Sequence, residues 1–203
     1  MTALSHDAIA ARVRSVFPSI EARISENSQP WLLVPAVDIQ AVSRFLRDDP
    51  DLDFASLMDL TGWDQLTYPA APPAKAPAKP DAVVKADVPA LPTDVIVVAY
   101  HLHSLRRRHK VSLKVLAPRT ACVVPTVSAI WPAAIYFERE VWDLLGVDFT
   151  GHPSLKRIMC PDDWVGHALR KDYLYPSDYH GVTHLRDGQK FVDPPARTVG
   201  ATL

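Results

Sequence analysis

The sequence has very few cysteines, which limits the redox chemistry open to it. Its 203 residues include only Cys122 and Cys160, which do not form a C-x-x-C pair. An iron–sulfur cluster held by four thiolates therefore cannot be built from this chain alone. The first residues also lack the apolar core of a secretory signal. We therefore expect a reducing, cytosolic compartment in which both cysteines are buried free thiols.

Glycine is also scarce, with seven residues in the chain. None of the motifs G-x-G-x-x-G, G-x-x-x-x-G-K-[ST] and G-x-S-x-G occurs. In these motifs, glycines allow the backbone to approach a phosphate closely or to expose a nucleophilic serine. The sequence therefore argues against the common nucleotide-binding loops and against an α/β-hydrolase site.

Long apolar runs and a large net charge are absent too. The longest apolar run, Val95 to Tyr100, is far shorter than a membrane span. The 22 basic and 23 acidic side chains give a formal net charge of −1, which argues against a surface built for nucleic acid. The basic cluster from Arg106 to Lys110 has no aromatic stacking platform, so we expect an exposed hairpin turn or a protein contact there.

The spacing of apolar residues predicts an α+β fold. Helical spacing indicates helices over residues 3–17 and 37–47, and a third that begins after Trp131 and ends in a left-handed cap at Gly146. Strand patterns cover Ile20–Ser25, Trp31–Val34, Asp53–Leu60, Val95–His103 and residues 111–115. The last strand alternates apolar and polar residues, as in a sheet covered on one side only. We expect a small, mostly antiparallel sheet packed with helices, followed by an extended C-terminal segment.

One stretch interrupts this pattern. Residues 69–92 contain 7 prolines and 8 alanines, and the prolines disfavour helix and remove hydrogen-bond donors from a strand. We expect an extended, solvated insertion between two strands, and a clamp on a partner is the alternative. These patterns divide the chain into an α+β domain over residues 1–149, which carries the insertion, and an extended partner-binding segment over residues 150–203.

The histidines do not form a convincing metal site. His101 and His103 share one face of a predicted strand, and His109 follows the next turn. Zinc sites need three or four ligands, and no carboxylate or thiolate nearby completes this set. His152 and His167 each follow a glycine, which is typical of turn histidines that form hydrogen bonds. We therefore expect no metal site in this chain.

The charged residues of the third predicted helix suit salt bridges better than catalysis. Glu138 and Glu140 are two residues apart, so they point in different directions on a helix. Arg139 and Asp143 are one turn apart and can pair. We expect a charged helix face at a surface or an interface, and no catalytic residue. Further on, residues 162–173 combine tryptophan, tyrosine and arginine, which dominate protein–protein contacts.

Two blocks of the sequence resemble a known family. Residues 138–147 (EREVWDLLGV) and 149–158 (FTGHPSLKRI) closely resemble the signature of the thirty-kilodalton subunit family of respiratory NADH dehydrogenase. The segment from Asp163 to Tyr173 resembles the family's following motif in order and spacing. Weaker agreement, which includes a predicted turn at residues 60–64, extends the resemblance to roughly residues 1–175. The departures are Lys156, Ala168 and Leu174, where the family usually has Arg, Pro and Pro.

The resemblance implies a subunit of NADH-quinone oxidoreductase, respiratory complex I, with no cofactor in this chain. FMN, iron–sulfur clusters, NADH and quinone would be bound by partner subunits. The expected neighbours are the quinone-proximal large D subunit and iron–sulfur subunits of the peripheral arm, on the cytoplasmic side of the bacterial inner membrane. The complex would couple electron transfer to proton translocation. The alternatives are the equivalent subunit of a membrane-bound hydrogenase or of another quinone- or deazaflavin-linked complex and, less favoured, a stand-alone histidine metalloenzyme.

The residues expected to serve as architecture and interface are the charged, aromatic and turn residues of the matched motifs. Among them, Arg157 and Arg170 are expected to form forked pairs with carboxylates. The full set is Glu138, Arg139, Glu140, Asp143, Gly146, Gly151, His152, Pro153, Arg157, Asp163, Trp164, Gly166, His167, Arg170, Lys171, Asp172 and Tyr173.

Overall fold

The computed structural model describes residues 3–23, 30–66, 92–183 and 191–192. Most of the predicted insertion at 69–92 and part of the predicted C-terminal segment lie outside these residues. The helices within them are α1 (His6–Val16), the short 3₁₀ helix η1 (Ala36–Asp38), α2 (Ile39–Asp48) and α3 (Ala134–Leu145). The strands are β1 (Glu21–Arg23), β2 (Trp31–Leu33), β3 (Ser56–Asp64), β4 (Val95–Ser104), β5 (His109–Pro118), β6 (Val123–Pro125), β7 (Asp148–Thr150), β8 (Tyr175–Pro176), β9 (Asp178–Tyr179), β10 (Val182–Thr183) and β11 (Phe191–Val192).

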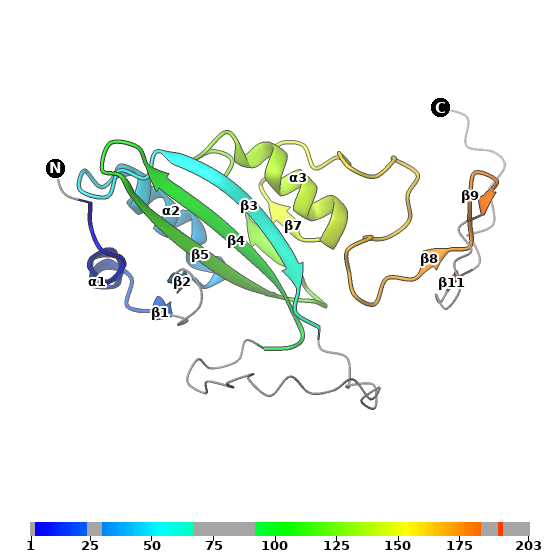
Figure 1. Ribbon diagram of the computed structural model, residues 1–203, viewed down its shortest axis with the longest axis horizontal. Helices are drawn as coiled ribbons and strands as arrows, with labels where there is room; N and C mark the ends of the chain where they lie inside the picture. The colour runs from blue at the N-terminus through cyan, green and yellow to red at the C-terminus, as the bar shows by residue number, and fades with distance from the viewer. Residues whose placement is uncertain (1–2, 24–29, 67–91, 184–190, 193–203) are drawn as a thin grey trace, which may run out of the picture.

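Five strands form the main sheet, in the order β1-β2-β5-β4-β3. β4 and β5 are a long antiparallel hairpin, and β3 pairs antiparallel with β4. β1 and β2 are also antiparallel, whereas β2 and β5 run parallel. The predicted α+β class with a mostly antiparallel sheet is therefore confirmed. Figure 1 shows α1 and β1 at one end of the molecule and the C-terminal segment leading away from α3 at the other.

The hydrophobic core lies on one face of this sheet. Alternate residues of β4 and β5, such as Ile96, Val98 and Leu113, pack together with apolar residues of all three α-helices, and each is fully buried. Because side chains alternate along a strand, the intervening residues point to the other face. The predicted one-sided packing of β5 is confirmed, although Ser112 on the opposite face is also buried.

The third strand is longer than its sequence pattern indicates. The pattern predicts an end at Leu60 before a turn at Thr61 and Gly62, but β3 continues to Asp64. A Cβ atom on Gly62 would lie 2.9 Å from Leu145 Cδ1 and 3.2 Å from the carbonyl oxygen of Val97. The glycine therefore allows α3 to pack closely on the strand, and it does not form a turn.

Replacing Gly62 by Ala is expected to lower the free energy of unfolding by about 1–3 kcal/mol, because overpacking forces neighbouring atoms to move. The measurement is urea unfolding of the full chain. Thr61→Ala is the matched control, since Thr61 is exposed on the same strand. Equal unfolding midpoints for the two variants would show that the contact with α3 tolerates a methyl group.

No helix in the described part of the chain is long and apolar enough to cross a bilayer.

Candidate functional site: the segment that follows helix α3

The segment after α3 begins by completing the C-terminus of that helix. The carbonyl oxygens at the end of a helix have no partners within it. Here the ring of His167 donates to the carbonyl of Asp143 at 3.0 Å, and the backbone N–H of Leu169 donates to that of Leu144 at 3.0 Å. Arg170 donates through Nε to the carbonyl of Leu145 at 2.7 Å. The positive charge of Arg170 also suits the negative end of the helix dipole.

Glycine makes this close approach possible. Gly146 caps α3 with a φ of 72°, which confirms the predicted left-handed cap. A Cβ atom at this position would lie 2.5 Å from the ring of His167 and 3.0 Å from Arg170. Gly151 and Gly166 also have positive φ, and a Cβ atom on Gly166 would lie 2.9 Å from the ring of Tyr173.

Asp143 is the centre of the second attachment. Its carboxylate is fully buried, and one oxygen accepts three backbone N–H groups, from Ile158 at 3.0 Å, Met159 at 2.8 Å and Cys160 at 2.9 Å. The other oxygen pairs with the guanidinium of Arg157. Burial alone would raise the pKa of this carboxyl, but the three N–H groups and the guanidinium outweigh it and lower the pKa to about 2.

Arg157 connects this carboxylate to the next part of the segment. Its second nitrogen donates to the carbonyl oxygens of Trp164 at 2.7 Å and Gly166 at 3.1 Å. On the neighbouring turn of α3, Arg139 donates to the carbonyls of Lys156 and Arg157, each at 2.9 Å. The two arginines thus fold residues 156–166 against the helix.

A further attachment joins the segment to the end of β3. Asp64, which is buried, accepts the backbone N–H of Lys171 at 2.9 Å and pairs with Arg119. Arg119 also pairs with Asp172 at 2.6 Å, and the ammonium of Lys171 donates to the carbonyl of Leu66 at 2.9 Å. Burial would raise the pKa of Asp64, yet its backbone donors and Arg119 hold that pKa below the usual value.

Glu138 forms a separate buried centre on α3. It is fully buried, and its carboxylate accepts the hydroxyl of Thr126 and the backbone N–H of Val127, the latter at 2.7 Å. Burial raises the pKa of Glu138 to about 7 despite these two donors. His152 lies 4.0 Å away, donating from Nε2 to the carbonyl of Ile135 and accepting the N–H of Ser154 at Nδ1.

Beyond these attachments, the segment carries aromatic and exposed apolar groups. Trp164 lies 6.4 Å from Tyr173 and 5.2 Å from Tyr179, measured between ring centroids. Asp163 accepts hydrogen bonds from Tyr179 and His180. Seven of the thirteen exposed large apolar side chains in the described chain lie between residues 158 and 182: Ile158, Met159, Val165, Leu169, Leu174, Tyr175 and Val182.

Several expectations for the helix residues are wrong. Asp143 pairs with Arg157 and not with Arg139, and both Asp143 and Glu138 are buried, so they do not belong to an exposed charged face. Arg157 does pair with a carboxylate, but Arg170 donates to the helix carbonyls of Leu145 and Gly146. In each case a buried or partly buried polar side chain finds its partner on another segment, at a separation in sequence that helical spacing does not indicate.

The remaining predicted residues are Glu140, which lies on α3, and Pro153, which lies in the segment after it. Glu140 and Pro153 are exposed. Of the two cysteines, Cys122 is buried as expected, whereas Cys160 is partly exposed, because it sits in the loop over Asp143.

The histidine candidates have structural roles. The sequence predicts His109 in an exposed turn, but it is buried, with Nε2 donating to the carbonyl of Leu52 at 2.7 Å and Nδ1 accepting the N–H of Leu4. His101 contacts the hydroxyl of Ser112 at 2.9 Å. Within the described ranges, no group of three potential ligands is arranged to hold a metal ion.

Sequence reasoning missed the partners that the motif residues bind outside their own segment. Asp64, Arg119 and Thr126 hold Lys171, Asp172 and Glu138, respectively. Asp64 lies in the predicted turn of the weaker resemblance, and Arg119 and Thr126 lie in a connection that no motif marks. The signal available was the polarity of Asp64 next to an apolar strand pattern.

Comparison with known proteins gives a consistent result. A family model described as respiratory-chain NADH dehydrogenase, 30 Kd subunit, matches residues 32–179. The C subunit of NADH-quinone oxidoreductase from Roseiflexus castenholzii is 36% identical over 186 residues, which are 91% of this chain and 93% of that protein. The C/D subunit of NADH-quinone oxidoreductase from Methylococcus capsulatus is 38% identical over 143 residues, which are 70% of this chain but 21% of that longer protein.

A solved structure supports the fold. The trypsin-resistant fragment (1-134) of Nqo5 aligns with a TM-score of 0.54 and 24% identity, covering 73% of this chain and 98% of that one. The resemblance inferred from residues 138–173 is therefore confirmed, both by the extent of the family match and by relatives that are C subunits over most of their length. The chain belongs to the family of the 30 kDa subunit of respiratory-chain NADH dehydrogenase and is a complex I subunit of that family.

Proposed function

We propose that this chain is a non-redox scaffold subunit of the peripheral arm of NADH-quinone oxidoreductase, on the cytoplasmic side of the bacterial inner membrane. NADH, FMN, the iron–sulfur clusters and quinone would be bound by other subunits of the complex. The assembled complex would transfer electrons from NADH to quinone and translocate protons. In this proposal the chain contributes surfaces that hold its neighbours in position.

The observation that carries the proposal is the concentration of exposed apolar side chains between residues 158 and 182. Apolar side chains left in water on an otherwise well-packed domain mark a surface that a partner covers. Asp143 and Arg157 hold the backbone of this surface between Ile158 and Gly166, and Arg170 attaches it to the end of α3. A preordered surface loses less conformational entropy on binding, which favours a stable assembly.

We propose that the main partner on this surface is the quinone-proximal large D subunit. Support comes from the relatives whose name combines C and D, in which a region similar to this chain is part of one longer polypeptide. Fusion of two proteins is compatible with function when their chains already lie side by side. Neighbouring iron–sulfur subunits of the peripheral arm would complete the contacts.

Replacing Val165 by Asp is expected to reduce co-purification of the large D subunit with the tagged chain at least tenfold, because Val165 is 63% exposed within the proposed surface. Burial of an unpaired carboxylate at an interface is strongly unfavourable. The measurement is quantitative mass spectrometry of complexes isolated from cells. Val37→Asp is the control, since Val37 is 80% exposed but lies in η1, outside this surface. Equal recovery of the large partner with both variants would contradict the proposal.

A non-redox role has its own test. The isolated full chain should show no visible absorption from flavin or iron–sulfur groups and no stoichiometric iron or zinc. A tightly bound chromophore would contradict the non-redox role, and stoichiometric iron or zinc would favour the metalloenzyme alternative.

A further inference from the structure

The face of the main sheet opposite the helices carries a row of aromatic and cationic side chains. Strand pairing aligns Arg23 of β1 with Trp31 of β2, and Trp31 with Ser112 of β5, so their side chains share this face. Lys114 lies two residues further along β5, and Trp63 projects from the edge strand β3. None of these residues belongs to the core that the helices cover.

Lys114 lies at the centre of this row, between two indole rings. Its ammonium is 4.2 Å from the ring centroid of Trp31 and 5.2 Å from that of Trp63. Trp63 can reach across β4 because the residue paired with Lys114 on that strand is Ala99, whose side chain is small. Ala99 is 1% exposed and Trp31 is 4% exposed, although the apolar residues of the described helices pack on the opposite face. The rings therefore cover the sheet and hold the ammonium above it.

The ammonium of Lys114 has no carboxylate within ion-pair distance among the described residues. Arg23, on the same face, differs in this respect because it pairs with Glu21 at 2.8 Å. Partial burial removes water from Lys114 and lowers its pKa. A partly desolvated cation over two aromatic rings gains further stability from an anion that completes its surroundings. In a protein partner, the anion that complements this site is the carboxylate of an Asp or Glu side chain.

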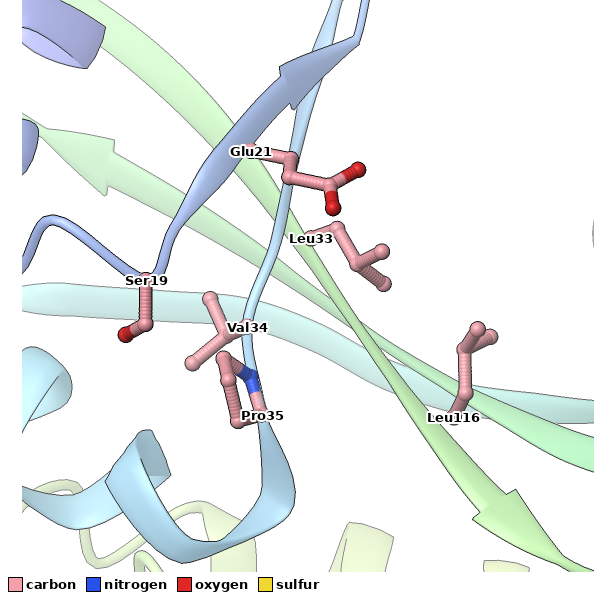
Figure 2. A pocket seen from close by; sticks show the side chains of 6 residues that line it. All are labelled: Ser19, Glu21, Leu33, Val34, Pro35 and Leu116. Carbon is pink, nitrogen blue, oxygen red and sulfur yellow. The ribbon is translucent and has the colours of Figure 1, made fainter. Parts of the chain in front are cut away.

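An apolar pocket lies beside Lys114. It has a volume of about 190 Å³ and is lined by Ser19, Glu21, Leu33, Val34, Pro35 and Leu116 (Figure 2). Leu33 pairs directly with Lys114 across β2 and β5, and Leu116 lies two residues beyond Lys114 on the same face. Residues two apart on a strand are separated by roughly 6.6 Å. This spacing equals that of alternate side chains in an extended peptide.

We propose that this face of the sheet is a second docking surface, which binds an extended segment of another subunit through an acidic side chain on Lys114 and an aliphatic side chain two residues away in the pocket. The proposal rests on the proposed function only in that the partner is a subunit of the same complex. This second docking surface lies on the opposite side of the sheet from α3, so it is separate from the surface over residues 158–182.

The test uses a photoreactive cross-linker in the assembled complex. A tagged chain carrying p-benzoyl-phenylalanine at position 116, and separately at the exposed position 61 on the same face, is produced in cells, purified with its complex and irradiated. We expect cross-links to another subunit, within three residues of an Asp or Glu. Lys114→Met should lower their yield at least threefold. Lys110→Met is the matched control, because Lys110 lies exposed on the same face of β5, and it should leave the yield unchanged.

The other outcomes would overturn the proposal. Cross-links to residues 67–91 of the same chain would mean that the chain covers its own sheet. Cross-links to a second copy would mean self-association, and their absence from both positions would mean that no partner lies on this face. An equal yield with Lys114→Met would exclude the carboxylate contact. The cross-linking results do not depend on the Val165→Asp experiment. If Val165→Asp left recovery of the large D subunit unchanged, the proposed interface over residues 158–182 would fail, and the cross-links would still test this second surface.

Discussion

Asp143→Asn is expected to reduce the free energy of unfolding by about 3–5 kcal/mol, although the two side chains have nearly the same shape. The carboxylate satisfies three backbone N–H groups and the guanidinium of Arg157 in a fully buried position. An amide places two N–H donors where acceptors are required. One orientation leaves Arg157 without its counter-charge, and the other leaves three backbone donors facing a donor, so neither can restore the network.

The pH dependence of this loss provides a second readout. The folded-state pKa of Asp143 is about 2, below the ordinary value of 3.8. The stability from its ionised form is therefore present above pH 3.8 and is lost as the pH falls through 2. The difference in free energy of unfolding between the original chain and Asp143→Asn should be constant from pH 5 to 8. It should decrease by about 2 kcal/mol as the pH falls through 2.

The measurement is urea unfolding of the full chain across this pH range, with limited proteolysis to follow residues 156–173. Asp162→Asn is the matched control, because Asp162 is exposed in the same segment. A loss below about 1 kcal/mol for Asp143→Asn would show that the segment is not held by this carboxylate.

Asp143 also shows why the sequence predicted more of the fold than of the site. The helix that carries it could be predicted because its apolar stripe and Gly146 follow local rules. The partner of Asp143 could not, since Arg139 offers the expected spacing of one helical turn while the actual partner is Arg157. The sequence pattern of charged helix residues that a later segment buries is the same as that of an exposed charged face.

The same reasoning applies to the sheet. The alternation in β5 predicts its apolar face, because that pattern is local. Gly62 resembles a turn residue in sequence because glycine often ends strands, whereas its role comes from the close packing of α3 against β3. Likewise, the stacking of Lys114 between Trp31 and Trp63 depends on strand order, which periodicity does not determine. Contacts between distant elements are therefore what the sequence pattern could not predict.

The chain is expected to lose about 3 kcal/mol of folding stability through Glu138 alone as the pH rises from 4.5 to above 7. The pKa of this carboxyl is about 7 in the folded chain, against an ordinary value of 4.5. The folded state therefore binds the proton more tightly than the unfolded state. Its stabilising contribution is complete below pH 4.5 and disappears as the pH rises through 7, the reverse of the behaviour of Asp143.

The physical cause is the surroundings of Glu138, which contain few groups that stabilise a charge. Thr126 and Val127 donate to the carboxylate, but the hydroxyl of Tyr100 is buried without a hydrogen-bond partner in the described structure, and its own pKa is raised by burial and by the charge on Glu138. His152 already donates its Nε2–H to the carbonyl of Ile135. Ionisation thus places a negative charge in a buried site with two donors.

Glu138→Gln isolates this effect, because a glutamine can accept from the N–H of Val127 and donate to Thr126, whose hydroxyl can donate to Ser128. Across urea unfolding measurements at pH 5, 6, 7 and 8, the free energy of unfolding of Glu138→Gln should rise relative to that of the original chain by about 2.5 kcal/mol. Other titrating groups are common to both proteins and cancel in the difference. Glu140→Gln is the control, because Glu140 is exposed on the same helix. Its free energy of unfolding should equal that of the original chain at every pH. If the Glu138→Gln difference stayed constant with pH, Glu138 would have to be ionised throughout, and a donor beyond Thr126 and Val127 would have to stabilise its charge.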